Sequence, residues 1–358
     1  MKLKQINKII AFSLLVMILV ISTASCSPKN DEPGNTTVAE PTTVQNNEPE
    51  PVADKPLRVA VVLSGKINDG GFNASAYTGL LAAEEKLGIE GAYSEDVQTV
   101  DAETAFRDYA SKGYDIVIGH GSQYADAMAT VAVEFPNIYF AITNADIQGE
   151  NLAGLDTRNE ETGYLAGYVM GKLSKSKIVG FAGSMQIVAL LRSEEGFILG
   201  AKDACPDCEV ISSWTGTWYD PAKEMETVIA MVEKGVDGIQ ATEWGFVEGC
   251  VEAGCYATIM GGSVNKIPEA PEVIAVSLYH SLDAVIIGII EEVQQGKFKP
   301  NEVRYHGFDT GIYSAELNYE LLEKNISAED IADIEEVIVK LTNNEIDLPH
   351  MSAMGETH

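Results

Sequence analysis

The sequence predicts an α/β protein with two similar lobes, each built on a parallel sheet. Short apolar runs alternate with segments of helical periodicity through most of the chain. This order also restarts, because residues 101–121 and 220–242 share an aspartate cap, an apolar stripe, a Lys-Gly pair and then a strand. We therefore expect two tandem lobes, residues 57–158 with a later returning segment and residues 159–358, with hinge crossings near 158 and 275–315.

The opening unit of the first lobe is a strand, a loop and a helix. Residues 58–63 are rich in valine and residues 64–71 form a glycine-bearing turn. Apolar residues then recur at helical spacing, at Phe72, Ala76, Leu80, Ala83 and Leu87. In open α/β sheets ligands bind beyond the carboxyl ends of the strands, so the loop 66–73 is the predicted place for a ligand.

The remaining elements follow from the same patterns. In the first lobe we expect a helix beginning near Asp101, a helix at 125–134, and strands at 92–97, 115–119, 139–143 and 152–156. A bridging helix at 159–173 has glycines four apart at 163, 167 and 171, which favours close packing inside a soluble protein. In the second lobe we expect strands at 177–183, 209–214 and 236–241 and helices at 194–205 and 220–234. In the last section we expect strands at 256–260 and 273–278, a helix at 283–295, a β-like run at 302–308 and a closing helix whose apolar stripe is Ile331, Ile334, Ile338 and Leu341. Periodicity does not assign the elements of this last section to a lobe.

The first 25 residues have the pattern of a signal peptide. Lysines at positions 2, 4 and 8 precede an apolar run at 9–21, and small residues stand just before Cys26. This resembles the lipobox of bacterial lipoproteins, although Thr23 replaces a larger aliphatic residue. The resemblance implies lipid on Cys26 and a place on the extracytoplasmic face of the cell membrane. Ordinary secretion is the alternative.

Residues 26–56 are predicted to be a disordered linker to the membrane. The segment is rich in Pro, Glu, Asn and Thr and has no aromatic residue, so it offers too little apolar area to offset the entropy of ordering. The net charge of -30 excludes nucleic acid as a partner, because binding to a duplex needs a basic face.

The cysteines of the folded part indicate disulfides more than catalysis. Cys205 and Cys208 form a turn that is compatible with a local disulfide outside the cytoplasm, and the same holds less clearly for Cys250 with Cys255. Their spacing is unusual for zinc, and we predict no metal and no cofactor. No phosphate loop, nucleophile elbow or compact Ser/His/Asp set is present, so we predict no catalytic residue.

Polar and aromatic residues gather at the predicted strand ends instead. Such a mixture suits a flat polar ligand held between rings. We interpret Asp220 as an N-cap before Pro221, and His120 as a structural histidine. The predicted ligand-binding residues are Asn68, Asp69, Phe72, Asn73, Asn144, Trp218, Trp244 and His280.

Three segments resemble the basic-membrane-protein (Bmp) family, the PnrA-like substrate-binding lipoproteins of ABC transporters. They are NDGGFN at 68–73, ETGYLAGYVMG at 161–171 and GTWYDPAK at 216–223. The resemblance implies a type I periplasmic-binding-protein-like fold, with two flavodoxin- or Rossmann-like lobes that are joined by a hinge and close on a ligand. It also implies an ABC permease as partner and a purine base or nucleoside as ligand.

The resemblance implies that the rings of Phe72 and Trp218 stack on the ligand. The family strand that usually ends in aspartate ends here in Asn144, which could still read a base edge. A family Asp-x-Asp motif on the ribose side is replaced by residues 261–265, and a family lysine by His280. These departures favour a free base such as adenine over a nucleoside.

Other functions stay open at this point. A sugar could lie against the same aromatic walls, and a receptor of this fold could dock a sensor protein instead of a permease. An extracellular enzyme is the third alternative, either a thiol oxidoreductase through Cys205 and Cys208 or a hydrolase using Asp69 and Glu243.

Overall fold

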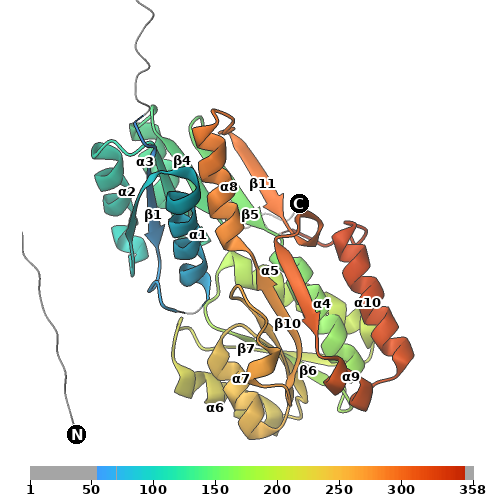
Figure 1. Ribbon diagram of the computed structural model, residues 1–358. Coiled ribbons are helices and arrows are strands. Elements are labelled where there is room, and N and C mark those ends of the chain that lie inside the picture. The colour runs from blue at the N-terminus through green and yellow to red at the C-terminus, as the bar shows by residue number, and fades with distance from the viewer. Residues whose placement is uncertain (1–54, 70, 351–358) are drawn as a thin grey trace, which may run out of the picture. The chain divides into compact units, whose positions relative to one another are not determined.

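The computed structural model describes residues 55–69 and 71–350, and these contain two six-stranded sheets. The predicted signal peptide, Cys26 and nearly all of the predicted linker lie outside the described residues. The strand order is β11-β5-β4-β3-β1-β2 in one sheet and β12-β10-β9-β8-β6-β7 in the other (Figure 1). All paired strands are parallel except β12, which is antiparallel to β10. The two-lobe α/β fold is therefore confirmed.

The first lobe is a parallel sheet covered by helices on both faces. Helices α1 and α8 share one apolar cluster with the sheet, and α2 and α3 share another on the opposite face. Its elements are β1 (Arg58–Leu63), α1 (Phe72–Leu87), β2 (Glu90–Ser94), α2 (Ala102–Ser111), β3 (Ile116–His120), α3 (Ala125–Glu134), β4 (Tyr139–Thr143), β5 (Leu152–Thr157), α8 (Leu282–Gln294) and β11 (Glu302–His306).

The second lobe repeats this plan. One face of its sheet packs against α4, α5, α9 and α10, and the other against α6 and α7. Its elements are α4 (Asn159–Leu173), β6 (Ile178–Gly183), α5 (Val188–Ala204), β7 (Glu209–Trp214), α6 (Pro221–Glu233), β8 (Gly238–Ala241), α7 (Trp244–Ala253), β9 (Tyr256–Met260), β10 (Ile274–His280), β12 (Tyr313–Leu317), α9 (Tyr319–Asn325) and α10 (Ala328–Thr342). Short 3-10 turns at 99–101, 122–124, 267–269 and 308–310 complete the chain.

The chain crosses between the lobes at three places. It passes from β5 to α4, from β10 to α8, and from β11 to β12. Helix α8 packs against α1, which places it in the first lobe although it follows a second-lobe strand (Figure 1). These three connections form the hinge.

Helices α4 and α5 pack with their backbones in direct contact. A side chain at Gly163 or Gly167 would overlap a carbonyl oxygen of α5, and one at Gly196 or Gly200 would overlap a carbonyl oxygen of α4. The close packing predicted from the glycine spacing is therefore confirmed. It holds α5 rigidly beside the start of α4, where the hinge begins.

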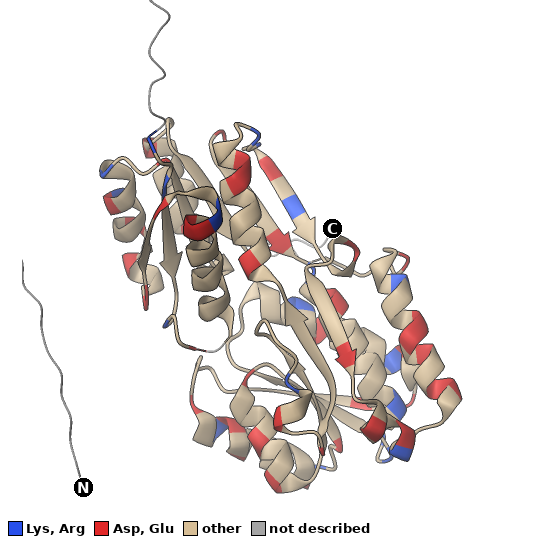
Figure 2. Cartoon of the chain, viewed as in Figure 1, with Lys and Arg blue, Asp and Glu red and all other residues tan. Residues whose placement is uncertain are grey.

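Acidic side chains are spread over both lobes. Figure 2 shows Asp and Glu on helices of each lobe, with α10 among the most acidic. This distribution agrees with the net charge of -30. Charge of this kind favours solubility and leaves the described surface without a broad basic face.

Candidate functional site

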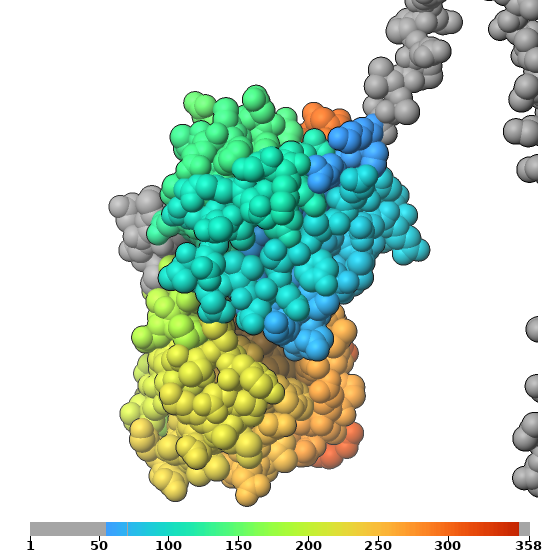
Figure 3. Space-filling view, turned by 90° about the vertical axis from the view of Figure 1, so that its left-hand side faces the viewer, coloured from blue at the N-terminus to red at the C-terminus, as the bar shows by residue number. Residues whose placement is uncertain are grey.

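The carboxyl ends of the two sheets face each other. A Cβ built on Gly71 in the loop after β1 would lie 3.9 Å from the Cα of Gly262, which follows β9. The rings of Phe72 and His280, from the two lobes, are 6.4 Å apart. Figure 3 shows the surface hollowed where first-lobe residues coloured blue lie across from second-lobe residues coloured yellow and orange. We call this region the interlobe cleft, and the fold predicts ligands here.

The loop between β1 and α1 is built around Asp69. Its carboxylate accepts hydrogen bonds from the backbone N–H groups of Gly71, Asn73 and Ala74 at 2.9 to 3.0 Å, and from Asn73 Nδ2 at 2.8 Å. An anion at this position satisfies the free N–H groups of the first turn of α1. Asn73 is buried, and its Oδ1 accepts from the Gly65 amide at 3.1 Å. Asp69 and Asn73 thus shape the loop, whereas Asn68 is exposed.

Phe72 belongs to a stack of rings in the cleft. It lies 3.8 Å, centroid to centroid, from the imidazole of His120, with an angle of 24° between the planes. His120 Nε2 donates to the carbonyl of Phe72 at 3.0 Å, and Nδ1 accepts from the hydroxyl of Thr143 at 2.8 Å. Burial lowers the pKa of His120 to about 3, so the ring is neutral. The ring is buried with both nitrogens bonded within the protein, which confirms the interpretation of His120 as a structural histidine, although its stacking on Phe72 was not predicted.

His280, at the end of β10, meets the ring of Phe72 edge-on, with an angle of 65° between the planes. Burial lowers the pKa of His280 to about 4, and its ring meets Tyr313 edge-on at 6.1 Å. Its Nε2 is buried and has no hydrogen-bond partner among the described residues. A neutral imidazole carries one donor and one acceptor nitrogen. His280 can therefore hydrogen-bond a polar edge of a neutral molecule that lies against Phe72.

The second-lobe candidates are less enclosed. Trp218 follows β7 and is 46% exposed, and no ring contact joins it to Phe72 among the described residues. Trp244 is the first residue of α7 and half-buried, and the ammonium of Lys266 lies 5.7 Å from its ring centroid. Asp220 accepts from the Lys223 amide and caps α6, which confirms its predicted N-cap role. The stacking of a ligand between Phe72 and Trp218 stays a prediction.

Asn144 holds the end of β4 in a tight turn. Its φ of 56° is in the left-handed region, which asparagine tolerates better than most residues. Its Oδ1 accepts from the hydroxyl of Thr157 at 2.7 Å. One lone pair of that oxygen is therefore engaged within the protein, which leaves its second lone pair and the amide nitrogen for a ligand.

Glu243 is a cleft residue that the sequence suggested only as part of a hydrolase. It stands between β8 and α7, and its position two residues after a predicted strand end was the available signal. Burial, followed by the charge of Glu224, raises the pKa of Glu243 to about 8, with a hydrogen bond to Ser184 opposing and the charge of Asp69 adding to the rise. A carboxyl that is neutral at pH 7 can donate a hydrogen bond.

The lysines near the cleft have partners within the protein. Lys66 pairs with Asp96 at 3.3 Å, and Lys266 pairs with Glu269 at 2.8 Å. Lys223 donates to the carbonyl of Thr215 at 2.6 Å. Carboxylates therefore compensate two of these lysines, whereas the ammonium of Lys223 is held by a neutral carbonyl.

The cysteines lie away from the cleft or are buried. Cys205 and Cys208 form a disulfide between α5 and the start of β7, at the edge of the sheet opposite to its carboxyl ends. The predicted compatibility with a local disulfide is confirmed. Cys250 and Cys255, for which a disulfide was the less clear expectation, are instead buried free thiols with sulfur atoms 3.1 Å apart. None of the four contributes to the cleft described above.

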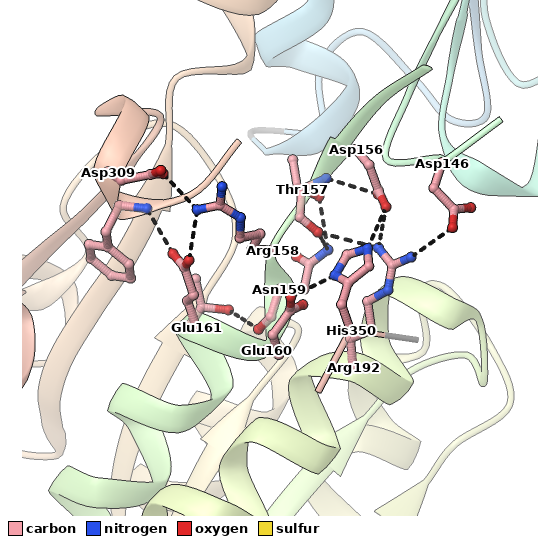
Figure 4. Close-up of polar contacts among 12 residues, drawn as sticks. Asp146, Asp156, Thr157, Arg158, Asn159, Glu160, Glu161, Arg192, Asp309 and His350 are labelled. Atoms are coloured by element: carbon pink, nitrogen blue, oxygen red, sulfur yellow. Dashed lines mark hydrogen bonds and ion pairs between the residues drawn. The ribbon is translucent and has the colours of Figure 1, made fainter. Parts of the chain in front are cut away.

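A second polar cluster, which sequence reasoning missed, occupies the hinge (Figure 4). Donor atoms of Asp146, Asp156 and His350 lie within 4.8 Å of one another, a spacing that would suit a cation. The guanidinium of Arg192 already lies 2.7 Å from Asp156 and 3.9 Å from Asp146. Because this cation compensates the carboxylates, we do not assign a metal to the cluster.

The other half of this cluster joins the first and third crossings. Glu161 of α4 accepts from the backbone N–H of Phe308 at 2.8 Å, and Arg158 lies 2.8 Å from Asp309. Burial raises the pKa of Glu161 to about 7, although the Phe308 amide and Arg158 oppose the rise. Residues 158–161 thus tie two connections of the hinge together.

Relatives with known names cover much of the chain. The transcriptional activator protein Med of Bacillus subtilis is 26% identical over 267 residues, which are 73% of this chain and 82% of the relative. A purine-binding protein of Brucella abortus is 28% identical over 52% of this chain and 54% of its own. A nucleoside-binding protein, BmpA of Lactococcus lactis, is 30% identical over 51% and 53%, and a putative glucose-binding protein of Haloferax volcanii is 27% identical over 53% and 49%. The chain thus spans about half the length of these last three relatives.

Solved structures agree with the fold. An ABC transporter solute-binding protein from Aeropyrum pernix K1 matches with a TM-score of 0.72 and 22% identity, over 82% of this chain and 93% of its own. Within the described residues, no helix has both the length and the apolar character needed to span a bilayer.

The family model described as "ABC transporter substrate-binding protein PnrA-like" matches residues 57–352, which is most of the chain. This agrees with the three segments that carried the resemblance and with the observed pair of hinged sheets. The predicted family and the predicted type I periplasmic-binding-protein-like fold are confirmed. The chain belongs to the Bmp family of ABC transporter substrate-binding proteins.

Proposed function

We propose that the protein binds a neutral purine base or purine nucleoside in the interlobe cleft and presents it to an ABC permease when the lobes close. The observation that carries the proposal is the stack of Phe72 on His120, with the unpartnered Nε2 of His280 beside it. A stacked base gains about 1–3 kcal/mol against an aromatic ring. A purine also offers ring nitrogens to both a neutral imidazole and a neutral carboxyl such as Glu243.

The charge of the cleft separates purines from their phosphorylated forms. Lys66, Lys223 and Lys266 have acidic or carbonyl partners, and Asp69 and Glu243 stand on opposite sides of the cleft. Among the described residues, a phosphate would have to displace these partners to reach a lysine ammonium. We therefore expect adenine, hypoxanthine and their nucleosides to bind, and the corresponding monophosphates not to bind.

The relatives support the same ligand class. Two of them are named for binding a purine or a nucleoside. The replacement of the family's acidic pair by residues 261–265, and of its lysine by His280, favours the free base. A sugar is the second candidate, since one relative is named as a putative glucose-binding protein.

Lipid anchoring through Cys26 is part of the proposal. Mass spectrometry of the membrane fraction tests it, with diacylated or triacylated Cys26 expected at the mature N-terminus. In the Cys26→Ser variant we expect the protein to leave that fraction. An unmodified Cys26, or cleavage at another position, would show ordinary secretion instead.

Isothermal titration of the full chain with adenine, hypoxanthine, adenosine, inosine, adenosine monophosphate, glucose and galactose tests the ligand class. We expect binding of one or more bases or nucleosides and none of the phosphate. Trp218→Ala should weaken binding about tenfold or more through lost stacking. Tyr319→Ala is the matched control, because Tyr319 is equally exposed at 46% but lies on α9, in the opposite part of the second lobe. Binding of sugars alone would overturn the purine assignment.

A further inference from the structure

The segment after α10 returns to the hinge. Ile346 and Leu348 pack against the apolar cluster of the second lobe, and His350 then reaches the junction of β5 and α4 (Figure 4). Nothing in the family resemblance or in the predicted cleft uses His350. Its position follows from contacts between residues about 190 apart in the chain.

Both ring nitrogens of His350 point at carboxylates. Nδ1 lies 2.6 Å from Oε1 of Glu160, and Nε2 lies 3.0 Å from Oδ2 of Asp156. An ionised carboxylate can only accept hydrogen bonds, so each nitrogen must donate. An imidazole donates from both nitrogens only when it is protonated. The geometry therefore assigns a positive charge to His350.

The two carboxylates lie on opposite sides of the first hinge crossing. Asp156 is in β5 of the first lobe, and Glu160 is in the first turn of α4 in the second lobe. His350 also meets the ring of Tyr305 in β11 edge-on at 5.1 Å, just before the third crossing. One side chain of the second lobe thus contacts two first-lobe strands and the hinge helix.

The protonated ring of His350 compensates the charge of buried carboxylates. Asp156 is fully buried and Glu160 is 2% exposed, while Asp146 lies at the edge of the same cluster. Arg192 of α5 approaches Asp156 and Asp146, and Glu160 Oε2 is buried without a hydrogen-bond partner among the described residues. Without His350, the ion pairs among the described residues would leave Glu160 buried with no cation. Separating an uncompensated buried charge from its partner is costly, so the contact holds the segment in place.

We propose that His350 is a hinge latch: through its contacts with Asp156 and Glu160, the C-terminal segment fixes the angle between the lobes and so controls their closure. The proposal rests on lobe closure, which the proposed function also uses, but it does not depend on the ligand. His350 acts as a positioning residue and contacts no ligand.

The protonation of His350 agrees with this geometry. Burial would lower its pKa, but hydrogen bonds to Asp156 and Glu160 outweigh burial and Arg192 and raise the pKa to about 9. Because the pKa is raised by folding, the latch contributes fully below the ordinary value of 6.5 and is lost as the pH rises through about 9. Other hinge groups also have shifted pKa values: Glu161 has a pKa of about 7, and burial lowers the pKa of His306.

The test uses the full chain without ligand at pH 7.5. In His350→Gln we expect hydrogen exchange in peptides covering residues 158–162 and 307–312 to speed up on the order of tenfold, with a larger radius of gyration in solution scattering. His350→Arg, which keeps a cation, should restore most of the protection. His306→Gln is the matched control, because His306 lies in the same hinge but its ring nitrogens have no described partner. We expect that control to leave exchange at residues 158–162 unchanged.

A second measurement keeps the proposal open to refutation if a variant fails to fold. The Cε1 proton of His350 in the wild-type chain should titrate by NMR near pH 9. A pKa near 6.5 would overturn the latch. So would unchanged exchange and scattering in His350→Gln, or equal effects of the His350 and His306 variants.

Discussion

The two halves of the interlobe cleft differ in how many of their side chains already have partners within the protein. In the first lobe, Asp69 and Asn73 form hydrogen bonds within the loop, and Phe72 is stacked on a buried histidine. In the second lobe, Trp218 and Tyr219 are 46% and 82% exposed. One half is formed before any ligand arrives, while the other still exposes its rings to water.

This difference separates residues that build the site from residues that would contact a ligand. Asp69 was predicted to bind the ligand, but its four hydrogen bonds serve the first turn of α1. Trp218 has apolar area left to bury, which favours contact with a ligand when the lobes close. Changes in the first half should therefore lower stability, and changes in the second half should lower affinity.

The largest expected effect tests that division directly. Asp69→Ala removes all four hydrogen bonds at the start of α1 and should lower the free energy of unfolding by about 2 to 3 kcal/mol. Trp218→Ala should change it by less than about 0.5 kcal/mol, because the ring is largely exposed. Urea denaturation of the ligand-free chains measures both. Asp69→Asn keeps one acceptor oxygen and should fall between Asp69→Ala and wild type.

A reversed result would refute the division. If Trp218→Ala destabilised the free protein as much as Asp69→Ala, the tryptophan would be part of the core. Its proposed contact with the ligand would then lose its basis.

Local patterns predicted most of the fold. The strands at 139–143, 209–214 and 256–260 and the helices at 125–134 and 159–173 have the predicted bounds, because each is a short apolar run or a capped periodic segment. Helix α7 was missed. Its Gly245 and Gly249 weaken helix propensity, but a side chain at either glycine would crowd the backbone of α6, so tertiary packing decides the element.

Helix α5 was predicted to begin at 194 and begins at Val188, and β12 and α9 were not predicted. β12 is an edge strand of only five residues, and its sequence alone does not predict a strand. Its antiparallel pairing with β10 determines this element. In the cleft, the sequence placed Phe72 and His280 near strand ends but did not predict that His120 stacks on Phe72. The hinge cluster could not be predicted from the sequence either, because His350 contacts Asp156 and Glu160, which lie about 190 residues earlier in the chain.

Glu243 gives the second half of the cleft a pH dependence, because the pKa of this partly buried carboxyl is raised. Its pKa rises from 4.5 in the unfolded chain to about 8 in the folded chain. The unfolded state therefore binds fewer protons between these values, and stability falls as the pH rises through that window. Glu243→Gln should remove this fall, so the variant should gain stability relative to wild type as the pH rises from 5 to 8.

Denaturation of both chains at pH 5 and pH 8 measures this difference. In the same variant, purine affinity should lose its decline above pH 8, because glutamine keeps a hydrogen-bond donor. Equal pH profiles for the two chains would show that Glu243 is ionised in the folded protein, and its role as a donor would be wrong.

The smallest expected effect concerns the partners of the two cleft rings. Phe72 stacks on a buried neutral histidine, whereas Trp244 has the ammonium of Lys266 at 5.7 Å, on a side chain that also pairs with Glu269 at 2.8 Å. Lys266→Met keeps the apolar stem and removes the charge, so it should cost only about 0.5 kcal/mol of stability. The loss should shrink in 1 M salt if the ion pair with Glu269 dominates, and persist if the ring contact does. A loss above about 2 kcal/mol would mean that Lys266 holds the second half of the cleft as firmly as Asp69 holds the first.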